Sequence, residues 1–244
     1  MSFEELQARF APVLEEFLNS ESIVRIRNSQ VTAEEYRSYL KQVYYCVREN
    51  PQLQALATVY FRGGRRDVVK GFFDHAVSEV GHDQLALNDY VTLGGDPTDV
   101  PYKNPLPATT ALTAFAFHQI YNQNPVGYLG YLYFLEFMPT GAGEEIKTGL
   151  LGAQIPPESM TFLQDHIEID QAHNRLMVYY AKQLVLSEAD VDAVDYAMRT
   201  TGYLYTELVE RAFADAHAPV DTGWNWEELN ADGRRPSDVA RKVA

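Results

Sequence analysis

The sequence has little cysteine, little basic charge and no long apolar run. Cys46 is the single cysteine, which excludes an internal disulfide framework and fits a reducing compartment. Lys and Arg total 20 against 34 Asp and Glu, and the resulting net charge of -14 disfavours nucleic acid and anionic membranes as partners. No apolar stretch approaches the roughly 18 residues that span a bilayer, and no basic segment precedes an apolar run at the amino terminus. We therefore expect a soluble, cytoplasmic protein.

The spacing of apolar residues indicates helices throughout. Between a few glycine and proline interruptions, apolar residues recur with the period of a helix rather than alternating as in a strand. Two of the predicted helices begin at capping residues. Thr32 is followed three residues later by Glu35, which completes a capping box, and Ser187 is followed three residues later by Asp190. The pattern predicts helices over residues 2–19, 32–51 with a continuation to about 61, 65–93, 108–122, 125–138, 142–151, 156–186 and 187–216.

These segments predict an all-α fold with a single domain. Seven or more helices, joined by short connections and one proline-rich loop over 97–107, are typical of a compact bundle, which we place over residues 1–216. The polar segment 217–244 is expected to be an irregular tail. Facing helices in the core of a bundle can assemble a metal site from their side chains.

The segment HIEIDQAH contains the most specific chemical pattern. His166, Asp170 and His173 stand at i, i+4 and i+7, so the three side chains share one helical face. Two imidazoles and a carboxylate suit iron, manganese or zinc better than calcium or magnesium. A structural role is the alternative reading, but two clusters of this kind in one chain favour a metal site.

A second cluster lies earlier in the chain. His75, Glu79 and His82 repeat the i, i+4, i+7 spacing and are expected on one face of one helix, although a structural role is equally open for the two histidines alone. Glu136 is a lone carboxylate in the apolar run YLYFLEFMP, and burial of such a group calls for a metal, a cation or a proton.

These residues are enough for two iron ions. Six or seven candidate ligands exceed the three or four protein ligands expected at one catalytic zinc. The preferred ligands are His75, His82, Glu136, His166, Asp170 and His173, with Glu79 as a bridging or alternative ligand. Two metals with open positions would suit oxygen chemistry.

The helix bearing EVGH, the later HIEIDQAH and the intervening FLE together resemble the haem-oxygenase-like di-iron oxidases and oxygenases, whose CADD-like and TenA-like relatives share the bundle. The likeness spans roughly residues 1–216. It implies that His166, Asp170 and His173 are ligands and that Glu136 and His82 match the family's intervening glutamate and earlier histidine. It also implies dioxygen activation at two irons to oxidise a small organic molecule, often an amino acid, amine or fatty acid. A further hypothesis is that the second iron is labile and is seen only with substrate. Bundle relatives suggest a homodimer.

The chain departs from this family pattern at one ligand. Some members carry a glutamate seven residues before the earlier histidine, where this chain has His75, and others carry one three residues before it, where this chain has Glu79. Either residue, or Glu49 in the second helix, is therefore a candidate to complete the ligand set.

Other activities remain as rivals. A metal-binding or interaction protein without turnover would need the same ligands. TenA-like thiaminases use a cysteine, but the position of Cys46 does not match theirs, and the first helix has no histidine to bind haem. His118, His217, Arg25, Arg27 and Arg62 are assigned to packing, solvent exposure or internal ion pairs, with a substrate contact as the alternative for the arginines.

Overall fold

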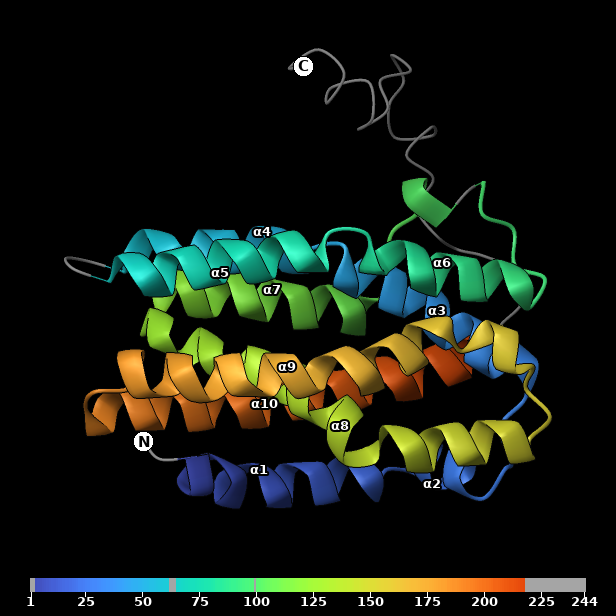
Figure 1. The fold of residues 1–244 in the computed structure, drawn as a ribbon. Coiled ribbons are helices and arrows are strands. Elements are labelled where there is room, and N and C mark those ends of the chain that lie inside the picture. Colours follow the sequence, from blue (N-terminus) through green and yellow to red (C-terminus); the bar gives the residue numbers. More distant parts are fainter. Residues whose placement is uncertain (1–2, 62–64, 99, 218–244) are drawn as a thin grey trace, which may run out of the picture.

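The computed structural model describes residues 3–61, 65–98 and 100–217, without the side chains of residues 3, 102 and 169–174. Within these residues the chain is all-helical, as predicted, with no strand (Figure 1). The α-helices are α1 (Phe3–Leu18), α2 (Glu21–Arg27), α3 (Ala33–Val47), α4 (Asn50–Ala57), α5 (Arg66–Glu79), α6 (His82–Thr92), α7 (Pro107–Asn122), α8 (Tyr128–Gly152), α9 (Thr161–Leu184) and α10 (Glu188–Asp215). Single 3-10 turns occupy Thr58–Tyr60, Val100–Tyr102, Pro125–Gly127 and Pro157–Ser159.

The helices form layers around α8 and α10. In Figure 1, α4 to α7 lie along the top, α9 and α10 cross the middle, and α1 and α2 lie along the bottom. α8 packs against both α9 and α10 and also contacts α2. Gly130 permits this close packing, because a Cβ atom there would lie 2.2 Å from the carbonyl oxygen of Val194 in α10. The segment of α8 that carries Glu136 therefore lies in the core.

Two helix starts are capped as the sequence predicts. The Thr32 side chain accepts a hydrogen bond from the Glu35 amide, and Glu35 accepts one from the Thr32 amide in return. Ser187 and Asp190 form the same capping box at the start of α10. Each box satisfies amides that the first turn of a helix leaves without a partner.

The predicted continuous helix over 65–93 is wrong. α5 ends at Glu79 and α6 begins at His82, because Gly81 takes a φ of 102° that interrupts the helix. Glycine adopts this left-handed conformation without the steric penalty of a Cβ atom. His75, Glu79 and His82 therefore do not share one face of one helix, and His82 belongs to a second helix.

The predicted separation of helices 125–138 and 142–151 is also wrong. α8 continues through Pro139, although this proline has no N–H to donate to the carbonyl four residues earlier. Such a residue bends a helix rather than ending it where tertiary packing holds both sides. Figure 1 shows the two ends of α8 running in different directions. α2 is absent from the helices expected from the sequence.

None of the described helices combines the length and the apolar character needed to cross a bilayer.

Candidate metal centre

The break between α5 and α6 places two histidines around one carboxylate. His75 Nε2 lies 3.6 Å from Glu79 Oε1, and His82 Nδ1 lies 3.3 Å from Glu79 Oε2. The side chains of His75 and Glu79 are buried, and that of His82 is 13% exposed. Each oxygen of Glu79 thus faces a different histidine.

Glu136 joins this group from the core helix α8. Its Oε1 atom lies 3.1 Å from His75 Nε2, and the residue is 6% exposed. A single ring nitrogen of His75 is thus close to two buried carboxylates. This nitrogen carries at most one proton, so it cannot donate a full hydrogen bond to both carboxylates. A cation placed among His75, Glu79 and Glu136 could contact all three side chains and offset the buried negative charge.

α9 contributes His166. Its Nδ1 atom lies 2.8 Å from the carbonyl oxygen of Phe162, one turn earlier, so Nδ1 carries the proton and donates it to this carbonyl. Nε2 is then the free donor atom for a metal, an arrangement typical of ligand histidines. The rings of His82 and His166 lie 5.0 Å apart, so α6 and α9 meet at this point.

A tertiary cap fixes the start of α9 beside α6. Asp89 in α6 is fully buried and accepts hydrogen bonds from the amides of Thr161 and Phe162 at 3.1 and 2.8 Å and from the Thr161 hydroxyl at 2.6 Å. It satisfies the first amides of α9, which have no intrahelical partner. The cap thereby sets how His166 lies relative to His82.

Two groups of potential ligand atoms result, and they share Glu79. The ligand atoms of His75, Glu79 and Glu136 all lie within 4.8 Å of one another, as do those of Glu79, His82 and His166. Mixed imidazole and carboxylate donors suit divalent transition metals. Each group could therefore hold a metal ion, and Glu79 belongs to both groups.

The protonation states also favour metal binding. Burial by itself raises the pKa of Glu79, but hydrogen bonds from His75 and His82 outweigh burial and hold its pKa below the ordinary value. Burial lowers the pKa of His166. Because a metal binds the neutral imidazole, the lowered pKa of His166 reduces competition from protons at its ring.

Three predicted ligands are not part of these two groups. The side chains of Asp170 and His173 lie outside the described residues, although the backbone places both residues on α9, one and two turns beyond His166. They stay predictions. Glu49 pairs with Arg48 at 3.0 Å and belongs to neither group of ligand atoms.

Asp165 is a further acidic residue that the sequence did not point to. Its Oδ2 atom lies 3.7 Å from Nε2 of His82, on the side of the ring away from Glu79. A carboxylate that accepts the second ring N–H of a metal-binding histidine fixes the orientation of the ring and makes the other nitrogen a stronger metal ligand. In the sequence, an acid next to His166 resembles any solvent-facing helix residue, so nothing marked it.

The remaining polar candidates lie elsewhere. Arg25 pairs with Glu35 at 2.8 Å and Arg27 pairs with Glu145 at 2.7 Å, whereas Arg62 lies outside the described residues. The side chain of His217 is 60% exposed and contacts Glu35 at 3.0 Å. His118 is also exposed and lies beside Asn122 and Gln123.

Cys46 is buried close to the site but is not poised as a nucleophile. Burial raises the pKa of its thiol to about 12, and Sγ lies 3.9 Å from the hydroxyl of Tyr131. The thiol is therefore protonated at neutral pH, whereas nucleophilic cysteines act as thiolates.

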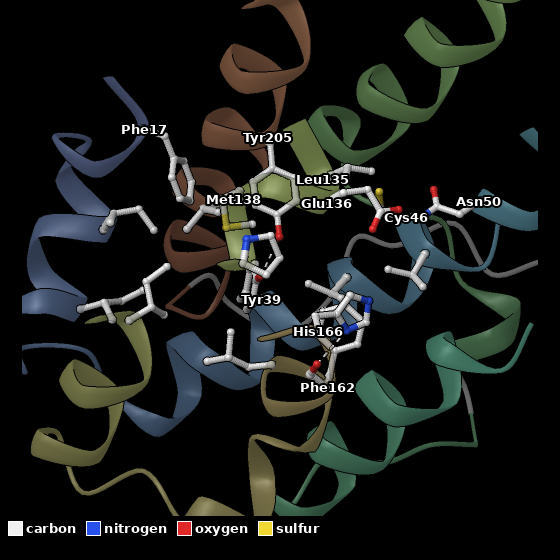
Figure 2. Close-up of a pocket in the computed structure, with 18 of the residues that line it drawn as sticks. Phe17, Tyr39, Cys46, Asn50, Leu135, Glu136, Met138, Phe162, His166 and Tyr205 are labelled. Carbon is white, nitrogen blue, oxygen red and sulfur yellow. Dashed lines mark hydrogen bonds between the residues drawn. The ribbon is translucent and has the colours of Figure 1, made fainter. Parts of the chain in front are cut away.

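A cavity opens directly onto the ligands. Glu79, Glu136 and His166 line one part of it, and Figure 2 shows Glu136, Cys46 and Asn50 on one side and Phe17 on the other. Most of the other lining side chains are apolar. A small molecule in this cavity could reach the metal centre while being shielded from water.

Comparison with known proteins gives the family. Residues 37–202 match the model of a family described as iron-containing redox enzyme. The chain belongs to this family. Membership supports an oxidoreductase that contains iron, in agreement with the carboxylate and histidine groups around Glu79. No curated protein matches the chain in sequence.

Solved structures similar to this iron-containing redox enzyme share its fold. A domain of unknown function with a haem oxygenase-like fold from Shewanella denitrificans is 26% identical, with a TM-score of 0.81 over 88% of this chain and 93% of that chain. A TenA homologue from Pseudomonas syringae is 14% identical, with a TM-score of 0.71 over 86% and 92% of the two chains. A CADD-like protein of unknown function from Nostoc punctiforme is 14% identical, with a TM-score of 0.65 over 90% and 99%. The haem-oxygenase-like bundle inferred from the sequence is thus confirmed.

Proposed function

We propose that this protein is a non-haem di-iron oxidase or oxygenase that uses dioxygen to oxidise a small organic molecule. One observation carries the proposal: the two oxygens of Glu79 face two different sets of ligands, one from α5 and α8 and the other from α6 and α9. A carboxylate shared in this way can bridge two metals, and helical bundles commonly assemble di-iron sites from such side chains.

The described residues divide naturally between two ions. His75, Glu136 and Glu79 would hold one, and His82, His166 and Glu79 the other, with Asp170 and His173 adding the remaining ligands. A catalytic site keeps coordination positions open for substrate, unlike a closed structural site. Ferrous iron bound there would supply redox chemistry with dioxygen.

The protein's own part in this chemistry is positioning and exclusion of water. The carbonyl of Phe162 holds the ring of His166 with Nε2 available, and Asp165 lies behind the ring of His82. Glu79 and Glu136 hold negative charge in the core, where their attraction for a cation is weakly screened. The apolar wall of the cavity keeps the substrate dry beside these ligands.

Iron stoichiometry tests the two-metal arrangement. Protein reconstituted anaerobically with ferrous iron should bind about two equivalents, since each of the two ligand groups would hold one ion. His75→Ala and His82→Ala should each lose about one, while Asp170→Ala and His173→Ala should each lose at least one. The matched control, Glu35→Gln, removes another buried carboxylate and should keep both. Binding of one iron or none in the unmodified protein contradicts the proposal.

Reaction with oxygen separates an enzyme from a passive metal binder. Stopped-flow mixing of the ferrous protein with oxygenated buffer should give an absorbance transient that substrate accelerates or strengthens. Tight zinc binding without iron preference, together with no response to oxygen, would favour a metal-binding protein without turnover. A thiaminase-like activity is the other rival, and the protonated thiol of Cys46 argues against it.

A further inference from the structure

A second and smaller cavity lies in the described part of the molecule, where α1, α8, α9 and α10 meet. We call it the small cavity, and the one that opens onto Glu79, Glu136 and His166 the large cavity. The residues that line the small cavity are all buried, and none is charged. They are Leu6, Leu129, Tyr133, Met177, Ala181, Val185 and Val194. The proposed function assigns no role to this cavity.

Along α8, the two cavities lie on opposite sides of Glu136. Leu129 and Tyr133, which line the small cavity, precede Glu136 by about two turns and about one turn. The large cavity begins at Leu135 and extends past Glu136 to Ile146. Leu129, Tyr133 and Glu136 stand at i, i+4 and i+7, so they share one face of the helix.

The same order is found along α9, which packs against α8 and runs in the opposite direction (Figure 1). The large cavity is lined by residues from the start of α9, the last of which is His166. The small cavity begins at Met177. The predicted ligands Asp170 and His173 lie between them, and Met177 follows at i+7 and i+4 on the same helical face. The candidate metal ligands therefore separate the two cavities.

The small cavity suits an apolar occupant better than water. A buried water takes about two to four hydrogen bonds from polar groups around it. Among the described residues of this wall, the hydroxyl of Tyr133 is the one hydroxyl, amide or charged side-chain group, and it has no hydrogen-bond partner there. Apolar cavities of this kind stay dry and take up small apolar molecules such as xenon.

Packing around Tyr133 and Val194 keeps the wall of the small cavity in place. The ring of Tyr133 stacks on the ring of Phe137 at 4.0 Å and contacts the ring of Phe10 at 5.4 Å. Val194 belongs to the close contact between α10 and α8 at Gly130. Because these groups are closely packed, they cannot move into the cavity without losing their contacts. The cavity is therefore formed before a ligand enters.

We propose that the small cavity is a binding site for dioxygen, from which dioxygen reaches the metal centre while the substrate occupies the large cavity. Dioxygen is small and apolar, so it passes from water into apolar surroundings. An organic molecule in the large cavity covers the ligands from that side, whereas the small cavity lies on their other side. This inference rests on the proposed function, which makes dioxygen a reactant.

Xenon tests whether the small cavity binds an apolar gas. Crystals of zinc-loaded protein, which has no redox activity, are exposed to xenon, and anomalous scattering locates the bound atoms. Xenon should occupy the small cavity beside Leu129 and Ala181. Ala181→Leu should remove this atom because the larger side chain fills the cavity, and Leu129→Ala should raise its occupancy. Unmodified protein without xenon in the small cavity overturns the inference, as does a xenon atom there that Ala181→Leu leaves in place.

The rate of reaction with oxygen tests whether the small cavity supplies the metal centre. Ferrous protein is mixed with buffer at several oxygen concentrations, and the absorbance change is followed. At low oxygen, Ala181→Leu should react about tenfold more slowly than the unmodified protein, because the larger side chain fills the site. The difference should shrink as oxygen approaches saturation, since the substitution leaves the ligands in place. Ala114→Leu, the same change on the exposed face of α7, is the matched control and should react at the unmodified rate.

A substitution in the large cavity distinguishes the two routes to the ligands. The apolar end of the large cavity is formed by Phe17 of α1, Ile23 and Ile26 of α2, and Val209 of α10. Val209→Phe narrows this end, and at low oxygen it should slow the reaction less than Ala181→Leu does. The reverse order would show that dioxygen arrives through the large cavity and would overturn the inference.

Iron content and thermal unfolding accompany each rate measurement. Ala181→Leu should retain both irons, and Ala181→Val, which adds a smaller side chain, provides the same test if Ala181→Leu does not fold. If the unmodified ferrous protein does not react with oxygen, the proposed function fails and this inference fails with it. If it reacts, and both Ala181 variants react at the unmodified rate, only this inference fails.

Discussion

The structure holds its buried acids in two different ways. Four acidic side chains are buried among the described residues, namely Glu35, Glu79, Asp89 and Glu136. Glu35 accepts a hydrogen bond from the Thr32 amide and pairs with Arg25, both at 2.8 Å. Asp89 accepts hydrogen bonds from two amides at the start of α9. Both acids therefore accept hydrogen bonds from protein groups in the folded protein, and these bonds do not depend on a metal.

Glu79 and Glu136 lie instead against histidine. Nε2 of His75 is 3.6 Å from one carboxylate and 3.1 Å from the other. One imidazole ring nitrogen donates at most one proton to these two negative charges, fewer donors than an arginine or a helix terminus provides. The difference teaches that burial of an acid alone does not point to a metal, whereas two buried acids around one histidine form a group that could hold a metal ion.

The largest expected effect concerns Glu79. Glu79→Gln replaces the shared carboxylate by a neutral amide of the same size and should remove both irons, because each ion loses its charged ligand. Metal analysis after anaerobic reconstitution measures this. Glu35→Gln should retain full iron content, and iron loss in both variants would remove the distinction between the two kinds of buried acid.

The next effect concerns Asp89. Asp89→Ala leaves buried amides of Thr161 and Phe162 without their acceptor and should lower the free energy of unfolding by about 2 kcal/mol. Urea unfolding measures the loss, with Asn88→Ala on the exposed side of α6 as the control. Iron binding through His82 and His166 should weaken as well, since the cap aligns α9 with α6. Unchanged stability would show that water replaces the carboxylate at no cost.

A change at Glu136 should act in opposite directions with and without metal. Glu136→Gln removes a buried charge, so the metal-free protein should become more stable by about 1.5 kcal/mol, whereas the iron-loaded protein should become less stable. Thermal unfolding with chelator and with ferrous iron compares the two states. A loss of stability in both states would place Glu136 with the structural acids.

The smallest effect concerns Glu35 and depends on pH. Burial raises its pKa, but hydrogen bonds from Thr32, His217 and Arg25 outweigh burial, so its pKa lies below the ordinary value of 4.5. A carboxylate with a lowered pKa stabilises the fold above its unfolded-state pKa, and this contribution is lost as the pH falls through the lower, folded-state value. Glu35→Gln should therefore cost about 1 kcal/mol at neutral pH, a typical net value for such bonds.

Urea unfolding at a series of pH values tests the sign. The difference between Glu35→Gln and the unmodified protein should shrink as the solution is made acidic. A difference that grows towards low pH would contradict the lowered pKa of Glu35.

Much of the fold could be predicted because it depends on neighbouring residues. The capping boxes at Thr32 and Ser187 each join residues three apart, and the sequence identified both. The cap of α9 could not be predicted, because Asp89 is separated from Thr161 by 72 residues. The predicted helix end before Pro139 was wrong for a related reason. Whether this proline ends or only bends α8 depends on the helices that pack against α8 on both sides of it.

The candidate site also has features that the sequence predicts and features that it does not. The spacing of His75 and Glu79 within one helix, and the isolation of Glu136 in an apolar run, were visible in the sequence because each is a local pattern. The turn at Gly81 was not recognised, and it is this turn that lets His82 approach the second oxygen of Glu79. Asp165 gave no local signal at all.

The sequence by itself determined the all-helical class, the family resemblance and the candidate ligands, since helical period and residue spacing are properties of short segments. Only the tertiary structure decided that Glu79 lies between two ligand groups and that α1 and α2 supply the apolar end of the cavity. These features join segments far apart in the chain, and their geometry depends on how whole helices pack rather than on any local pattern.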